Sequence, residues 1–290
     1  MFRGAITALV TPFKNGAIDE EAYRALIEWQ IEQGIDGLLP CGTTGESATM
    51  SHEEHEEAVR ICIEQVKGRV PVMAGAGSNN TAEAIRLTAF AKQAGADAAL
   101  LISPYYNKPT QEGLFRHFKA INDAVDLPLF VYNVPGRTGC SIPVSVVERL
   151  AKHPNICGIK EASGDMSYAA KIAHCVGPDF ALWSGNDDIT IPILSLGGSG
   201  VISVWANVQP TECHQMVQEY LTGDQNKARE IYLKYLQVMN HLFLEVNPIP
   251  VKTAMNMMGM GVGPMRLPLC EMSEGAAATL RATLAEAGLV

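Results

Sequence analysis

Lys160 and three tyrosines are the side chains of this sequence whose types and positions best suit nucleophilic chemistry. Lys160 and Tyr132 each end a short apolar segment, and Tyr105 and Tyr106 closely follow another. A lysine amine removed from water has a lowered pKa and an exposed lone pair that can attack a carbonyl carbon, while a phenol can move the accompanying protons. Taken singly, such a lysine more often extends its head group to solvent, and a tyrosine at a strand end is commonly packing. Together they predict Schiff-base chemistry.

Two further segments suit the binding of carboxylates. Residues 41–46 read Cys-Gly-Thr-Thr-Gly-Glu, which places Thr43 and Thr44 between two glycines just ahead of an expected helix. Glycines let several N–H groups point at one spot and hydroxyls add donors, although an ordinary hydroxyl-capped turn is the simpler interpretation. Arg137 stands on a Pro-Gly turn after Tyr132, and its planar guanidinium suits bidentate pairing.

Eight short apolar segments are expected to form the strands that position these residues. They lie at 5–10, 37–40, 71–74, 98–102, 128–132, 156–160, 180–184 and 200–204. Helix-like segments alternate with them, at 19–33, 51–66, 81–94, 111–124, 144–151, 166–175 and 189–196. Strands without polar alternation, separated by helices, indicate a parallel sheet covered by helices, and eight such units favour a (β/α)8 TIM barrel. In such barrels the reacting groups stand at the carboxyl ends of the strands.

The last part of the chain is expected to add helices to the barrel, at 210–246 as one or two, 250–258 and 271–287. We therefore predict a catalytic barrel over residues 1–223 and a C-terminal helical extension over residues 224–290. No stretch is long enough to be a linker to an independent domain.

Composition narrows the classes of function. The 290 residues are 47% hydrophobic, which suits a large core, and the net charge of −9 offers no basic field for nucleic acid or an acidic membrane surface. Seven scattered cysteines form no Cys-x-x-Cys pair and suit a reducing, cytoplasmic location. The apolar start ends by Val10, too short for a membrane span.

Motifs for metals and nucleotide cofactors are not convincing. His52 and His55 are three residues apart, whereas the zinc-protease motif needs four. Residues 75–80 and 259–263 are rich in glycine but lack the spacing or strand context of a dinucleotide fingerprint. We predict no metal and no cofactor.

Four segments at strand ends, together with the N-terminal residues 4–12, resemble those of the pyruvate-dependent class I aldolases related to N-acetylneuraminate lyase. The four segments are residues 42–46, 104–109, 132–139 and 158–162. The likeness extends to Asn247-Pro248-Ile249-Pro250-Val251-Lys252. It is closest to the branch of the family that condenses pyruvate with L-aspartate 4-semialdehyde, in the diaminopimelate route to lysine. Gly136 is a local departure, at a position where serine or alanine also occurs in this turn, and it changes no assigned role.

This resemblance implies a role for each site residue. Lys160 forms the Schiff base with pyruvate, and Tyr132, linked through Thr43 to Tyr106, carries the protons. Thr43 and Thr44 hold the pyruvate carboxylate and Arg137 meets the carboxylate of the semialdehyde. Backbone carbonyls near Gly185 and Ile202 border the lysine.

The same resemblance implies assembly and regulation. Tyr106 reaches across a subunit interface in the family, so a homotetramer built as a dimer of dimers is expected. Members inhibited by L-lysine bind this effector through positions matched here by Ser47, Ala48, His52, His55, Asn79, Glu83 and Tyr105. We therefore predict feedback inhibition by L-lysine.

Two alternatives remain open from the sequence. The chain could be another aldolase of the family, such as N-acetylneuraminate lyase or a 2-keto-3-deoxy-sugar aldolase, although Arg137 suits a carboxylate-bearing aldehyde better. It could also be a non-catalytic barrel that binds a metabolite, because fold alone does not establish function.

Overall fold

The eight apolar segments expected to be strands all form strands in the computed structural model, which describes residues 2–290. Residues 98–102 match in full, and no end of the other seven differs by more than two residues. The strands are β1 (Gly4–Ala8), β4 (Gly37–Leu39), β5 (Met73–Gly75), β6 (Ala98–Ile102), β7 (Leu129–Asn133), β8 (Ile156–Glu161), β9 (Ala181–Ser184) and β10 (Gly200–Ser203).

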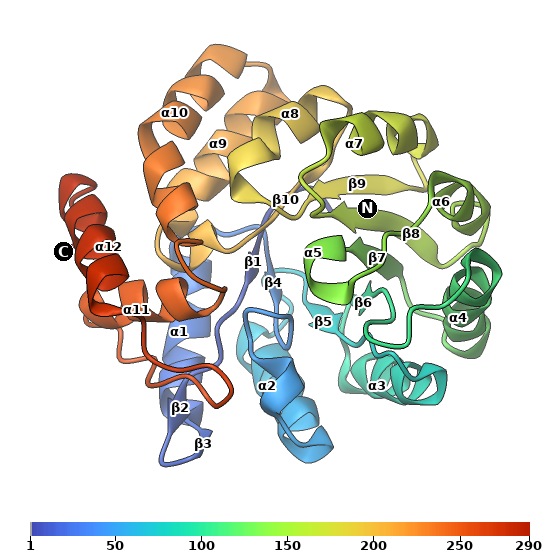
Figure 1. Cartoon of the computed structure of the whole chain (residues 1–290), viewed down its shortest axis with the longest axis horizontal. Helices are drawn as coiled ribbons and strands as arrows, with labels where there is room; N and C mark the ends of the chain where they lie inside the picture. The colour runs from blue at the N-terminus through green and yellow to red at the C-terminus, as the bar shows by residue number, and fades with distance from the viewer. Residues whose placement is uncertain (1) are drawn as a thin grey trace. The chain divides into compact units, whose positions relative to one another are not determined.

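The chain divides into two compact units, which are described separately. Unit 1 comprises residues 2–3 and Pro71–Ile202, and unit 2 comprises Gly4–Val70 and Ser203–Val290. Figure 1 follows the chain from blue to red. The division at residue 223 separates a catalytic part from appended helices and stays a prediction.

A parallel sheet forms the centre of unit 1. Its strands are adjacent in the order β5, β6, β7, β8, β9, and β9 pairs with the start of β10. Every residue of β7 and β9 is buried, as expected for strands covered on both faces. The register pairs Tyr132 of β7 with Lys160 of β8, and Asn133 with Glu161. The two residues expected to do chemistry therefore lie one residue before the ends of neighbouring strands.

Helices follow the strands of unit 1 in chain order. They are α3 (Thr81–Ala94), α4 (Gln111–Ala124), α6 (Val144–Leu150), α7 (Met166–Ile172) and α8 (Thr190–Ser195). Consecutive members of this series pack side by side, and Figure 1 shows α3, α4, α6 and α7 outside the strands that they connect. A short helix, α5 (Pro135–Thr138), was not expected and carries Arg137.

Unit 2 holds the parallel pair β1 and β4 and most of the long helices. Helices α1 (Glu20–Glu32) and α2 (His52–Val66) pack together, and α9 (Pro210–Thr222) packs on β1 and on α10 (Gln225–His241). The segment expected as one or two helices is thus two, separated at Gly223, whose φ of +111° suits glycine alone. Helices α11 (Ile249–Met257) and α12 (Glu274–Glu286) pack against each other.

A capping box explains why α2 begins at His52. Ser51 accepts a hydrogen bond from the Glu54 amide at 3.2 Å while its own amide donates to the Glu54 carboxylate at 3.0 Å, a complete capping box. Single 3₁₀ turns occur at Ser47–Thr49, Ala173–Cys175, Asp187–Ile189 and Trp205–Asn207. A two-residue turn at Asn15 and Gly16, both with positive φ, joins the antiparallel strands β2 (Phe13–Lys14) and β3 (Ala17–Ile18), a hairpin that was not expected.

Candidate active site

Lys160 and Tyr132 lie together at the carboxyl ends of β8 and β7. Their Cα atoms are register partners, and the Lys160 Nζ lies 4.5 Å from the centre of the Tyr132 ring. Both side chains are buried, with exposed fractions of 6% and 8%. The amine and one phenol therefore lie close together within unit 1.

The environment of Lys160 favours the neutral amine. The pKa of Lys160 is lowered to about 7, mainly by removal of the amine from water. The carboxylate of Asp187 acts against this fall in pKa, and the guanidinium of Arg137 contributes to it. Among residues 2–290 the amine makes no hydrogen bond or ion pair with a protein group. About half of such amines are neutral at pH 7, compared with fewer than about one in a thousand for an ordinary lysine. The lone pair needed for attack on a carbonyl is thus available.

Gly185 leaves room for the lysine stem just after β9. A Cβ at this position would stand 3.0 Å from the Lys160 Cε and 2.6 Å from the Ala162 Cβ. Glycine is therefore required for the close approach of this loop to the lysine. Gly185 lies beside the Lys160 stem. Ile202 is buried near the end of β10, and the site roles assigned to both residues stay predictions.

Arg137 is held at the surface on α5. The single hydroxyl hydrogen of Thr138 is shared between the carbonyls of Cys140 and Val134, which lie 2.8 and 3.2 Å from the hydroxyl oxygen. These contacts fix the short helix, and Gly139 ends it with a φ of +69°. The guanidinium is exposed and its charge acts on Lys160. This position suits the recognition of a substrate carboxylate.

Both tyrosines after β6 are exposed to solvent. Tyr106 is 90% exposed with a φ of +69°, and Tyr105 is 39% exposed. The amide of Asn107 donates to the Tyr105 carbonyl at 2.8 Å, which closes a tight turn. A large aromatic ring in solvent is unusual for a single chain and suits contact with another molecule.

The turn that carries Thr43 and Thr44, in unit 2, is fixed by hydrogen bonds from other parts of that unit. Thr44 is buried, and its hydroxyl oxygen accepts a hydrogen bond from the side-chain amide of Asn247 at 3.0 Å. The Thr11 hydroxyl donates to the Gly45 carbonyl at 2.8 Å. Thr43 is half-buried at the start of the turn that its carbonyl closes with the amide of Glu46. The threonines thus stand on a rigid turn.

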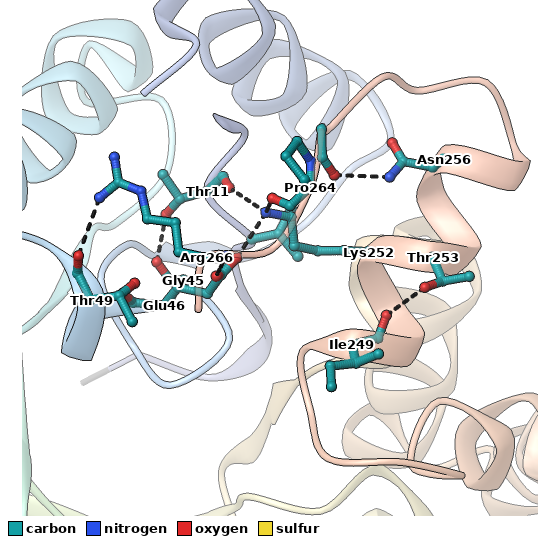
Figure 2. A network of polar contacts seen from close by, with 12 residues as sticks. Thr11, Gly45, Glu46, Thr49, Ile249, Lys252, Thr253, Asn256, Pro264 and Arg266 are labelled. Carbon is teal, nitrogen blue, oxygen red and sulfur yellow. Dashed lines mark hydrogen bonds and ion pairs between the residues drawn. The ribbon is translucent and has the colours of Figure 1, made fainter. Parts of the chain in front are cut away.

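A buried ion pair in unit 2 was not predicted from the sequence. Lys252 and Glu46 are fully buried and their Nζ and Oε1 atoms are 2.8 Å apart (Figure 2). The ammonium also donates to the carbonyls of Thr11 and Pro264, at 3.1 and 2.7 Å, and the other Glu46 oxygen accepts from the Arg266 amide at 2.9 Å. Glu46 has left-handed backbone geometry, with a φ of +56°. The pair therefore anchors the end of the threonine turn.

The residues expected to bind L-lysine fall in both units. In unit 1 the Asn79 side chain donates to the Tyr105 carbonyl at 3.2 Å, and the Glu83 carboxylate accepts from the Ser78 hydroxyl. In unit 2, Ser47 and Ala48 form part of a 3₁₀ turn, and His52 and His55 stand on the first turn of α2 with His55 buried. The structure brings Asn79 and Tyr105 into contact.

Residues 2–290 contain neither a candidate metal cluster nor a candidate membrane-spanning helix. No cluster of three or more histidine, cysteine, aspartate or glutamate side chains is arranged to hold a metal ion in this range. None of the helices described here combines the length and the apolar character needed to cross a membrane.

Comparison with known proteins extends over the complete chain. The model of the dihydrodipicolinate synthetase family matches residues 1–287. The 4-hydroxy-tetrahydrodipicolinate synthase of Nitratidesulfovibrio vulgaris (strain DP4) is 56% identical over 290 residues, which are 100% of this chain and 99% of that protein.

Solved structures agree with the sequence comparison. A dihydrodipicolinate synthase from Cyanidioschyzon merolae with lysine bound has a TM-score of 0.96 and 43% identity, covering 100% of this chain and 99% of that one. A monomeric dihydrodipicolinate synthase variant has a TM-score of 0.97 and 45% identity, covering 100% and 98%. The predicted (β/α)8 TIM-barrel fold with additional C-terminal helices is confirmed. The chain belongs to the dihydrodipicolinate synthetase family.

Proposed function

We propose that this chain is a lyase, a 4-hydroxy-tetrahydrodipicolinate synthase, and that Lys160 forms its Schiff base. The observation that carries the catalytic assignment is a buried amine, unpaired with any protein group in residues 2–290, whose pKa is lowered to about 7 next to a phenol. The name shared by full-length relatives supports the synthase over the sugar-aldehyde aldolases and over a non-catalytic barrel.

The proposed reaction begins with attack of the neutral Lys160 amine on C2 of pyruvate. The carbonyl oxygen gains a proton, the carbinolamine loses water, and an imine forms. Loss of a proton from C3 gives an enamine, and its C3 atom forms the new bond to the aldehyde carbon of L-aspartate 4-semialdehyde. Tyr132, whose ring centre lies 4.5 Å from the amine, is assigned the role of proton carrier.

Carboxylate recognition is assigned to three residues. Thr43 and Thr44 present hydroxyls on a turn that is fixed by Thr11 and Asn247. Because Thr44 already accepts from Asn247, its own hydrogen is free to be donated to an anion. Arg137 supplies an exposed guanidinium for the semialdehyde carboxylate.

Trapping of the imine tests the proposed function. Borohydride is added to the protein with pyruvate, and peptides are analysed by mass spectrometry. The expected result is one reduced pyruvate on the peptide that contains Lys160, none on the peptide that contains Lys252, and none in the Lys160→Met variant. An unmodified Lys160 in protein that still condenses pyruvate with the semialdehyde would reject the assignment.

A homotetramer built as a dimer of dimers is proposed, with Tyr106 completing the proton relay through Thr43 in a second copy of the chain. Support comes from the 90% exposed ring of Tyr106. Mixing the inactive variants Lys160→Met and Tyr106→Phe should restore part of the activity, because each mixed dimer then has one intact site. If the mixture has only the summed activity of the two variants, Tyr106 does not complete the site of a second copy.

Regulation by L-lysine is proposed through Ser47, Ala48, His52, His55, Asn79, Glu83 and Tyr105. The relative from Cyanidioschyzon merolae has lysine bound, and the Glu83 carboxylate could pair with a cationic side chain. Millimolar lysine should inhibit the wild type, and Glu83→Gln should weaken the inhibition without changing the rate in its absence. Full activity of the wild type in lysine would reject the proposal.

A cytoplasmic location is proposed from the cysteines. All seven are free thiols, the state expected in a reducing compartment.

A further inference from the structure

Asn133 and Glu161 form a buried pair directly after the two residues assigned to chemistry. They follow Tyr132 and Lys160 in sequence, and they are themselves register partners at the ends of β7 and β8. The Asn133 Nδ2 donates to the Glu161 Oε2 at 2.7 Å, and both side chains are almost completely buried. Successive side chains of a strand point to opposite faces, so this pair lies on the face of the sheet opposite to the amine and the phenol.

The two remaining oxygen atoms of the pair hold two loops. The Asn133 Oδ1 accepts from the amide of Ile142, at 2.9 Å, in the segment that follows the Arg137 helix. The Glu161 Oε1 accepts from the amide of Ser163, at 2.6 Å, in the loop after β8. The hydroxyl of Tyr168 on α7 also donates to the Ile142 carbonyl at 2.6 Å. Asn133 and Glu161 thus connect two strands and two loops with fixed donor and acceptor roles.

Burial of the Asn133–Glu161 pair contributes little to the stability of the fold. Burial raises the pKa of Glu161, and hydrogen bonds from Asn133 and Ser163 act against this rise. No lysine, arginine or histidine within residues 2–290 forms an ion pair with the carboxylate. A buried polar pair without a cation gains little over apolar packing, but it defines one geometry because every alternative leaves a donor or acceptor unmet.

We infer that Asn133 and Glu161 are positioning residues that hold the Tyr132 phenol next to the Lys160 amine and fix the segment that follows Arg137. This inference rests on the proposed role of Lys160. The pair does not touch the substrate, and it acts through the ends of β7 and β8. Displacement of a reacting group by about 1 Å can cost about 100-fold in rate, so such a role has a measurable consequence.

Reciprocal exchange of the two side-chain types tests the inference. Glu161→Gln gives position 161 one acceptor for two donors, and a flip of the Asn133 amide only moves the mismatch to Ile142. Asn133→Asp sets two carboxylates against each other. The double variant Asn133→Asp with Glu161→Gln restores all three hydrogen bonds with the donor reversed, and it keeps the net charge of the pair.

The rate of imine trapping at Lys160 is measured together with kcat and KM for condensation. Each single variant should trap pyruvate about 10–100-fold more slowly, with the larger loss in kcat and a changed pH profile. The double variant should return to within about 3-fold of the wild type, as expected for strongly coupled neighbours. Asn122→Asp is a matched control in unit 1, because Asn122 also donates to a carboxylate, that of Asp123, at 3.0 Å. It should leave trapping unchanged.

Two outcomes would overturn the inference: single variants that trap and turn over like the wild type, or a double variant no better than the worse single one. If Glu161→Gln does not fold, Tyr168→Phe removes only the bond to the Ile142 carbonyl and should lower kcat by about 2–10-fold. A wild-type kcat in that variant would also count against the inference. Absence of trapping in the wild type would instead reject the role of Lys160.

Discussion

Two buried lysines, one in each unit, have opposite environments. Lys252 of unit 2 is fully buried, and its ammonium donates hydrogen bonds to Glu46 and to two backbone carbonyls, as Figure 2 shows. Lys160 of unit 1 is nearly as buried, but its amine lies against the ring of Tyr132 and meets no protein acceptor in residues 2–290. Burial lowers the pKa of both, and only for Lys252 does a hydrogen-bonded carboxylate act against that shift.

This difference shows that burial alone does not make a lysine a nucleophile. A buried ammonium with a carboxylate and two carbonyls has every proton satisfied, so its lone pair stays occupied. An amine that is buried without an acceptor gives up its proton near neutral pH and keeps its lone pair exposed. Lys252 is therefore a structural residue in our account, and Lys160 is the reactive one.

Replacing each lysine by methionine should separate the two roles most clearly. Lys160→Met should lower condensation by about 10⁴-fold or more, as loss of a catalytic nucleophile does. Its free energy of unfolding at pH 7 should not fall, because an unpaired buried amine is removed. Steady-state rates and urea unfolding provide the measurements. Appreciable turnover in this variant would break the comparison.

Tyr132→Phe should reduce the rate by about 10²–10⁴-fold, because the ring remains beside the amine but its proton carrier is lost. The same change leaves the apolar contact with Lys160 in place, so the melting temperature should change little. Pre-steady-state measurement of imine formation checks whether the loss falls on this step. A rate equal to that of the wild type would exclude Tyr132 from proton transfer.

Lys252→Met should destabilise the protein by about 3–5 kcal/mol, because the Glu46 carboxylate is left buried without its cation. Adding Glu46→Gln to this variant removes the unpaired charge and should recover part of the loss. Urea unfolding of both variants, with Lys152→Met as an exposed-lysine control, measures the effect. Equal stabilities of the single variant and the control would show that the pair is not structural.

Arg137→Ala should have the smallest effect on the chemistry itself. We expect a rise of about 10-fold in KM for the semialdehyde and a smaller change for pyruvate, since an exposed guanidinium is lost from only one carboxylate. The pKa of Lys160 should rise as well, because the repulsion by Arg137 is removed. Equal changes for both substrates would remove the assigned selectivity.

The sequence predicted the reactive lysine better than the structural one. Lys160 ends a short apolar segment, and this local pattern placed it at the carboxyl end of a strand. Lys252 and Glu46 are 206 positions apart, and no local pattern relates them. Asn133 and Glu161 were missed for a similar reason, because their contact depends on the register between β7 and β8. The hairpin around Asn15 and Gly16 had the appropriate turn residues, but its two-residue strands are too short for an alternating pattern.

The lowered pKa of Lys160 also makes the stability of the protein depend on pH. The folded pKa of Lys160, about 7, lies below the ordinary value of 10.5. Between these values the unfolded chain binds more protons than the folded one, so the contribution of Lys160 to stability rises with pH across this window. Lys160→Met should remove this rise.

Titration of the lysine side chains by NMR, with 13C at Cε, shows whether the Lys160 amine loses its proton near neutral pH. We expect one signal with a midpoint of about 7, and this signal should be absent from the Lys160→Met variant and retained in Tyr132→Phe. A Lys160 signal that titrates near its ordinary value of 10.5 would contradict the account, because the amine would then be charged and unreactive at neutral pH.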